Sequence, residues 1–276
     1  MAELSDLIAN LDLFDLDATA TTTASDNHHT LRKICTRGCD RPINVCLCKT
    51  IPTEPISTCT QVVILHHPHE RRHKLATVPV LQKCLWNCEI IIGRRLSYGD
   101  SSILDSLYTD AIEKPNEPLR ALFLFPGTGT LPSVEINQWK YSFGDANLNN
   151  HVLIAFDGTW KHAKEMVHAS VPFLSKFAIQ VCLNYDVGVH GGTIFDSDLI
   201  LRKEPFIGCM STMEAVARCL RVLESNGDVI ELRMVEVLRA MVRFQACFLK
   251  PMKARPRLFK KGRVDEKKNV KSELPG

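Results

Sequence analysis

The chain has 276 residues, of which 45% are hydrophobic, which is enough for one large domain with a sizeable core and a small module beside it. No apolar run approaches the length that crosses a bilayer, and residues 1–30 carry six acidic side chains without a lysine or arginine. We therefore expect neither a membrane protein nor a secretory or mitochondrial signal. Eleven cysteines then favour the reducing cytoplasm or nucleus.

Charge is distributed unevenly along the chain. The net charge is only +3, but the residues from Lys250 onward carry ten basic side chains against three acidic ones. A basic tail on a nearly neutral body suits a polyanion such as RNA, although a solvated tail explains the composition equally well. We expect residues 1–30 to be a disordered acidic, threonine-rich leader and residues 250–276 a disordered basic tail.

Four cysteines lie within fourteen residues in the pattern C-x3-C-x6-C-x-C. Four thiolates this close match the tetrahedral set that Zn²⁺ prefers, so residues 31–50 are predicted to be a zinc module. The spacing differs from the commoner C-x2-C pairs, and four incidental cysteines are the alternative. The predicted metal ligands are Cys35, Cys39, Cys46 and Cys48. The remaining cysteines stand in apolar contexts and are expected in the core: Cys59, Cys84, Cys88, Cys182, Cys209, Cys219 and Cys247.

A β-rich run at residues 60–66 predicts a strand, and the proline, glutamate and basic residues of 67–74 predict a helix after it. Such a helix could contact RNA phosphates, while a solvated cationic face is the rival explanation. The candidate RNA-binding residues here are His67, Arg71 and Arg72, and Arg41 in the zinc module joins them. We expect no metal at His66, His67 and His69, because alternate residues diverge on extended backbone and no further ligand is evident.

The following residues alternate between strand and helix patterns. Strands are expected at 88–92, 120–125, 151–156 and 178–183, and helices are expected at 160–170, 211–223 and 228–248, with a further helix that ends near Asn87. Ser211 with Glu214 three residues later forms a capping box at the start of one helix. This alternation predicts an α/β domain over 51–249, with a mostly parallel sheet and helices on both faces.

A carboxylate directly follows one buried strand. Asp157 stands at the carboxyl end of residues 151–156, where active-site residues of parallel sheets collect. Gly158 allows a tight turn, Thr159 can cap the next helix, and Trp160 begins it. Capping and core packing would explain these residues if the motif stood alone.

Three loops are predicted to leave this edge of the sheet, at 126–130, 157–160 and 184–193. A nucleotide-like cofactor fits such a place, since small residues let the backbone approach a ligand. Neither G-x-G-x-x-G before a helix nor G-x-x-x-x-G-K-[ST] occurs, which argues against dinucleotide and ATP phosphate sites.

Taken together, these motifs resemble the DTW-domain family, the tRNA-uridine aminocarboxypropyltransferases, in its eukaryotic branch. The stretch from Asp157 to Trp160, with Ala163 behind it, carries the signature. Five further motifs of the family occur in the family's order within residues 35–215, some before and some after this signature. They are Cys35-x3-Cys39-x-Arg41-Pro42-x3-Cys46-x-Cys48, His67-Pro68-x-Glu70, Leu124-Phe125-Pro126, Arg202 and Ser211-Thr212-x-Glu214-Ala215.

The resemblance implies a SPOUT-related, knotted fold and S-adenosylmethionine as donor. Its 3-amino-3-carboxypropyl group would pass to N3 of a tRNA uridine, releasing S-methyl-5'-thioadenosine. The implied catalytic residues are Asp157 as base, Thr159 and Trp160. The implied donor-binding residues are Phe125, Pro126, Gly127, Arg202, Ser211 and Thr212, with Arg202 on the donor carboxylate. The alternatives are a SPOUT-type RNA methyltransferase and a non-enzymatic, zinc-containing RNA-binding protein.

Overall fold

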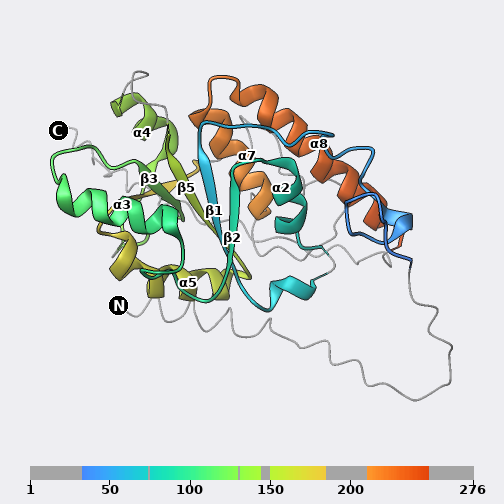
Figure 1. Cartoon of the computed structure of the whole chain (residues 1–276), viewed down its shortest axis with the longest axis horizontal. Coiled ribbons are helices and arrows are strands. Elements are labelled where there is room, and N and C mark those ends of the chain that lie inside the picture. Colours follow the sequence, from blue (N-terminus) through green and yellow to red (C-terminus); the bar gives the residue numbers. More distant parts are fainter. Residues whose placement is uncertain (1–32, 74, 130, 144–149, 185–209, 249–276) are drawn as a thin grey trace, which may run out of the picture. The chain divides into compact units, whose positions relative to one another are not determined.

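The computed structural model of this chain describes residues 33–73, 75–129, 131–143, 150–184 and 210–248 (Figure 1). Six strands form one sheet in the order β2-β1-β5-β3-β6-β4, and all neighbouring pairs are parallel. The strands are β1 (Gln61–His66), β2 (Cys88–Ile92), β3 (Ala121–Leu124), β4 (Val134–Glu135), β5 (Val152–Asp157) and β6 (Ala178–Cys182). The α/β fold with a parallel sheet is therefore confirmed.

The described helices are α2 (Val78–Cys84), α3 (Ser102–Glu113), α4 (Ile136–Phe143), α5 (Trp160–Leu174), α7 (Thr212–Leu223) and α8 (Gly227–Ala246), with short 3₁₀ turns η2 (Ile43–Val45) and η3 (Glu70–Arg72). None of these helices is long and apolar enough to cross a membrane. The leader, the basic tail, most of the 184–193 loop and Arg202 lie outside the described residues. The predicted knot and domain bounds stay predictions.

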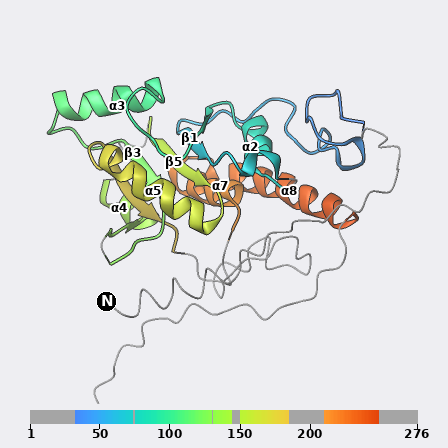
Figure 2. The same cartoon turned by 90° about the horizontal axis from the view of Figure 1, so that it is seen from below.

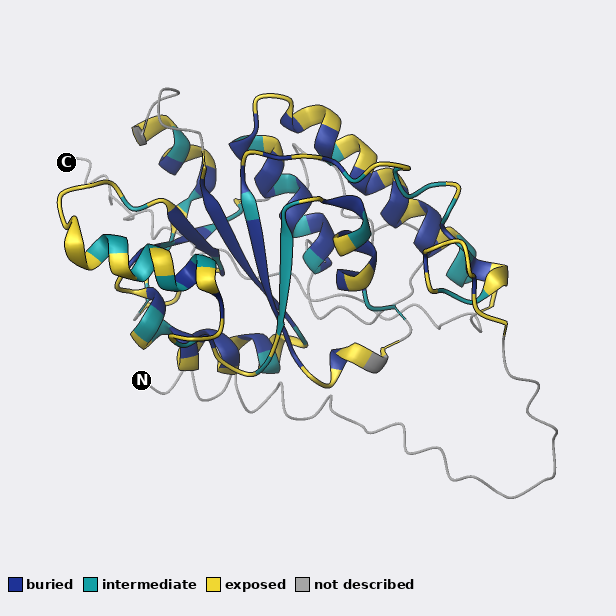
Figure 3. Ribbon diagram, viewed as in Figure 1, coloured by how far each residue is buried: buried dark blue, intermediate teal, exposed yellow. Residues whose placement is uncertain are grey.

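The sheet separates two apolar layers. Val62 and Ile64 of β1 pack in a cluster with α2, α7 and α8, while Val63 and Leu65 pack in a second cluster with α3 and α5. Successive side chains of a strand point to opposite faces, so this alternation places helices on both sides of the sheet, as Figure 2 shows. Figure 3 shows the central strands buried and α8 buried along one flank only.

The predicted strands each lie within one residue of an observed strand, and the predicted helices after residues 160, 211 and 228 are present. α5 continues to Leu174, beyond the predicted end at residue 170. The predicted helix over 67–74 is wrong, because the chain forms only the three-residue turn η3 there and His73 is extended. Residues 67–74 contain no apolar stripe that could hold a helix against the sheet. The elements α3, β4 and α4 were not predicted.

Candidate active site

The ends of β1 and β5 bring a histidine and an aspartate together. The strand register pairs His66 with Asp157, each the last residue of its strand. His66 lies two residues after Ile64, and Asp157 lies two residues after Ala155. Both side chains therefore point to the same face of the sheet as Ile64 and Ala155, which is the α7 side. Nδ1 of His66 lies 2.7 Å from Oδ2 of Asp157, and both residues are buried, with Asp157 only 8% exposed. His66 was not predicted to belong to the site.

The N-terminus of α7 supplies the third member of this group. Thr212 donates a hydrogen bond from Oγ1 to Oδ1 of Asp157 at 2.5 Å. Ser211 caps the same helix, since its Oγ accepts a hydrogen bond from the backbone N–H of Glu214 at 3.2 Å. Both carboxylate oxygens of Asp157 are therefore engaged by side chains, one from β1 and one from α7. The predicted capping box thus begins a helix that reaches directly into the site.

Glu214 anchors this end of α7. Its side chain is completely buried, and Oε1 accepts a hydrogen bond from Nη2 of Arg218, one turn later, at 2.8 Å. A buried carboxylate needs such a partner, because an uncompensated charge in the interior is expensive. The ion pair helps to hold the first turn of α7, and with it Thr212, against the end of β5.

The first turn of α5 carries the other predicted catalytic residues. Thr159 is the N-cap, and its Oγ1 accepts a hydrogen bond from the backbone N–H of His162 at 3.3 Å. Trp160 begins the helix and is 38% exposed, with its ring centre 6.3 Å from that of Phe125. As an acceptor in the cap, the Thr159 hydroxyl keeps its proton for another partner. A partly exposed aromatic ring therefore stands at the start of α5, three residues after Asp157 in the chain.

The loop after β3 lies next to Trp160. Gln180 of β6 donates hydrogen bonds from Nε2 to the carbonyl oxygens of Phe125 at 3.0 Å and Pro126 at 3.2 Å. A Cβ on Gly127 would lie 2.6 Å from Oγ and 2.9 Å from the backbone nitrogen of Ser133, so only glycine fits this close approach. The structure thus brings Phe125, Pro126 and Gly127 to the same edge as Trp160, whereas Ser211 and Thr212 lie on the α7 side.

The four predicted metal ligands form one cluster. The sulfur atoms of Cys35 and Cys48 are 3.6 Å apart, those of Cys39 and Cys46 3.6 Å, and those of Cys46 and Cys35 3.4 Å. All four lie within 4.8 Å of one another, so the cluster can hold a metal ion. The cluster region packs into the core through the fully buried Leu47.

The cysteine cluster favours ionisation at one sulfur. Burial alone would raise the pKa of Cys39, but backbone hydrogen bonds with Arg41 and Leu47 and thiol hydrogen bonds with Cys48 and Cys46 lower that pKa to about 6. Burial raises the pKa of Cys48 to about 12, with hydrogen bonds to Cys39 and Cys35 acting in the same direction. One thiolate therefore forms readily at Cys39, while the raised pKa of Cys48 disfavours a second negative charge beside it. A bound divalent cation would lower the pKa of the remaining thiols.

The other cysteines do not all behave as predicted. Cys84 and Cys219 are buried, and Cys88 and Cys182 are partly buried, but Cys59 and Cys247 are exposed, so the core assignment is wrong for these two. Cys59 precedes β1 in a surface turn, and Cys247 follows the last turn of α8. Cys209 lies outside the described residues.

The predicted RNA-binding residues are spread over two regions. Arg41 is in the cysteine cluster, where its Nε donates a hydrogen bond to the carbonyl oxygen of Val45 at 3.3 Å, and η2 of that region lies beside α8 (Figure 1). His67 is 2% exposed, and Arg71 on η3 is exposed. The structure does not describe the side chain of Arg72. RNA contact at these residues stays a prediction.

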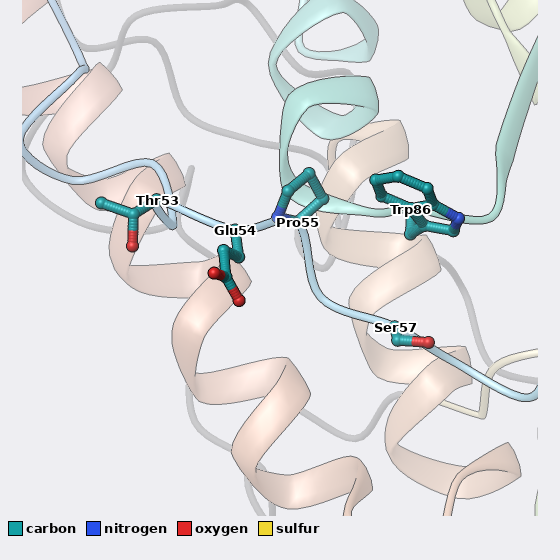
Figure 4. Close-up of a pocket in the computed structure, with 5 residues that line it drawn as sticks. All are labelled: Thr53, Glu54, Pro55, Ser57 and Trp86. Atoms are coloured by element: carbon teal, nitrogen blue, oxygen red, sulfur yellow. The ribbon is translucent and has the colours of Figure 1, made fainter.

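A separate hollow lies at the other edge of the sheet, among the segments that precede β1 and β2 (Figure 4). Its lining residues are Thr53, Glu54, Pro55, Ser57 and Trp86. It contains none of the predicted site residues. This hollow is therefore a different place from the carboxyl ends of β1 and β5, where His66 and Asp157 meet.

Comparison with known proteins agrees with this arrangement. The model of the DTW domain matches residues 32–246. The chain is 48% identical over 248 residues to tRNA-uridine aminocarboxypropyltransferase A of Arabidopsis thaliana, covering 86% of this chain and 89% of that relative. It is 33% identical to tRNA-uridine aminocarboxypropyltransferase 2 of Drosophila melanogaster, over 75% of this chain and 73% of the relative. No solved structure matches the chain. By the extent of the domain match and of these identities, the chain belongs to the DTW-domain family.

Proposed function

We propose that this chain is a tRNA-uridine aminocarboxypropyltransferase, which moves the 3-amino-3-carboxypropyl group of S-adenosylmethionine to N3 of a tRNA uridine. The observation that carries the proposal is the buried Asp157, held by His66 and Thr212 at the carboxyl edge of a parallel sheet. This arrangement lies within a chain that shares 48% identity with a relative named for this activity.

The reaction requires removal of a weakly acidic proton. Uridine N3 becomes a nucleophile once it has lost its hydrogen, and it then attacks the methylene carbon beside the sulfonium. The carbon–sulfur bond breaks, its electron pair stays on sulfur, and S-methyl-5'-thioadenosine leaves. We assign Asp157 as the proton acceptor, because each carboxylate oxygen keeps a lone pair beyond those used by His66 and Thr212.

His66 and Thr212 orient the base. A carboxylate only accepts hydrogen bonds, so Nδ1 of His66 carries the proton in this pair. With both oxygens tethered, Asp157 loses little freedom when the uracil arrives, and the productive geometry is present beforehand. Trp160 stacks on the uracil through its exposed face, and the Thr159 hydroxyl donates to a uracil carbonyl.

S-adenosylmethionine binds between the loop after β3 and the start of α7. Phe125 and Pro126 provide an apolar wall, Gly127 lets their loop fold closely against Ser133, and Ser211 stands at the start of α7. Arg202 pairs with the donor's carboxylate, since a guanidinium binds a carboxylate in a bidentate manner. Transfer of the propyl arm rather than the methyl group then follows from which carbon faces N3.

We further propose that Cys35, Cys39, Cys46 and Cys48 hold Zn²⁺ in a structural role. Four cysteine sulfurs within 4.8 Å match the closed tetrahedral coordination of structural zinc. The ion would hold Leu47 in the core beside α8, in a segment with little apolar surface of its own.

Mass spectrometry of unmodified tRNA transcripts incubated with the purified protein and S-adenosylmethionine tests the activity. We expect one uridine to gain an aminocarboxypropyl group while methylthioadenosine accumulates. Asp157→Asn should abolish turnover and leave donor binding, measured by calorimetry, within a few-fold of the unaltered protein. A methylated base with S-adenosylhomocysteine would establish a methyltransferase instead. Full turnover by Asp157→Asn would refute the role of the base.

A further inference from the structure

Three histidines meet beside the active site, on the α5 side. His67 and His69 flank Pro68 just after β1, and His162 lies in the first turn of α5. One imidazole nitrogen of each lies within 4.8 Å of the others. The third imidazole was not evident from the sequence, because it comes from a distant segment that the parallel β1–β5 pairing brings alongside.

The rings are packed closely together. The His67 and His162 rings stack with centres 3.8 Å apart and planes 12° apart. His69 meets both edge-on, with its ring centre 4.9 Å from that of His67 and 5.4 Å from that of His162. A metal must lie in the plane of each ligating ring, so one stacked ring has to turn about its Cβ–Cγ bond on binding. The incomplete burial of His162 and the exposure of His69 leave room for that turn.

The ring nitrogens of the group differ in their partners. Nδ1 of His67 accepts a hydrogen bond from the backbone N–H of His69 at 3.3 Å, so its single lone pair is in use and a metal at this nitrogen would replace that hydrogen bond. Nδ1 of His162 is buried and has no hydrogen-bond partner among the described residues. Buried polar atoms in native proteins are nearly always satisfied, so this unpaired nitrogen, on a ring in contact with two other imidazoles, is open to a ligand.

Gly158 makes this approach possible. A Cβ at residue 158 would lie 3.1 Å from Cβ of His162 and 3.4 Å from Cβ of His67. A side chain at residue 158 would therefore require His162 to shift by a few tenths of an ångström and would fill the space next to His67. The glycine that follows Asp157 therefore serves the histidine cluster as well as the turn.

We propose that His67, His69 and His162 bind a divalent transition-metal ion, with Zn²⁺ the best match, at a site separate from the four cysteines. Imidazole suits Zn²⁺, and three protein ligands leave one tetrahedral position open. Because His69 is exposed, this position faces solvent and is accessible to water or a phosphate oxygen. The ion would tie the segment after β1 to the turn of α5 that carries Thr159 and Trp160.

Metal analysis of the full-length, untagged protein tests the site. The protein is saturated with Zn²⁺, dialysed against metal-free buffer and analysed by plasma mass spectrometry, alongside His69→Gln and His162→Gln. The matched control is His168→Gln, an exposed histidine on the same helix. We expect both cluster variants to lose one equivalent of zinc per chain relative to the unaltered protein, while the control loses none.

A second measurement distinguishes the two metal sites. Co²⁺ bound to cysteine thiolates gives sulfur-to-metal charge-transfer absorption, which Co²⁺ bound to imidazoles lacks. His69→Gln should therefore retain the charge-transfer bands while it binds one equivalent less of Co²⁺. Thermal unfolding followed by circular dichroism checks that each variant is folded. Equal zinc content in the cluster variants, the control and the unaltered protein would overturn the proposal, as would an equal loss in the control.

Discussion

The hydrogen bond from Thr212 to Asp157 provides the sharpest test of the site. Thr212→Val keeps the shape of the side chain and removes the hydroxyl that donates to Oδ1 at 2.5 Å. A hydrogen bond to a charged group contributes about 2 kcal/mol. If all of it serves to hold the base in its reactive orientation, the loss corresponds to a decrease of roughly 30-fold in kcat, since about 1.4 kcal/mol is tenfold.

The assay is the rate of methylthioadenosine release at saturating tRNA, with donor affinity measured separately by calorimetry. Thr212→Ser is the matched control, because it keeps the hydroxyl and should retain most of the activity. We expect Thr212→Val to lower kcat with donor affinity changed only slightly. Unchanged kcat in Thr212→Val would refute the positioning role. A loss confined to donor affinity would instead make Thr212 a donor-binding residue.

Three further changes probe other parts of the molecule. Trp160→Ala should weaken tRNA binding by about 1–3 kcal/mol through lost stacking, with little change in melting temperature because the side chain is 38% exposed. Fluorescence anisotropy with labelled tRNA measures the affinity, and Trp160→Phe should retain part of the affinity that Trp160→Ala loses. Glu214→Gln should destabilise the fold by about 3 kcal/mol in urea unfolding, since it breaks a buried ion pair with Arg218; a midpoint equal to that of the unaltered protein would contradict this. Removal of the metal from Cys35, Cys39, Cys46 and Cys48 with a chelator should lower the melting temperature, because Leu47 of that segment is fully buried in the core. An unchanged melting temperature after complete loss of the metal from these cysteines would argue against a structural role.

The sequence by itself determined the sheet and the individual motifs. Five strands could be predicted to within one residue, because their apolar runs are short and end at turn residues. The cysteine spacing predicted a cluster that the structure shows. These patterns are local, and a residue's nearest neighbours in the chain are enough to specify them. The helix over 67–74 was predicted wrongly because basic side chains resemble a helix face where no apolar stripe exists to dock it.

The tertiary structure alone decided which side chains meet. The apolar run at residues 151–156 predicts that Asp157 stands at the carboxyl end of a strand, but only the register with β1 places His66 opposite it. Thr212 reaches the same carboxylate because α7 packs on that face of the sheet, and His162 joins His67 because α5 begins on the other. Register and crossover direction depend on contacts between segments far apart in the chain, so no local pattern encodes them. The position of the proposed base, Asp157, is thus readable from the sequence, while its partners His66 and Thr212 come from the fold.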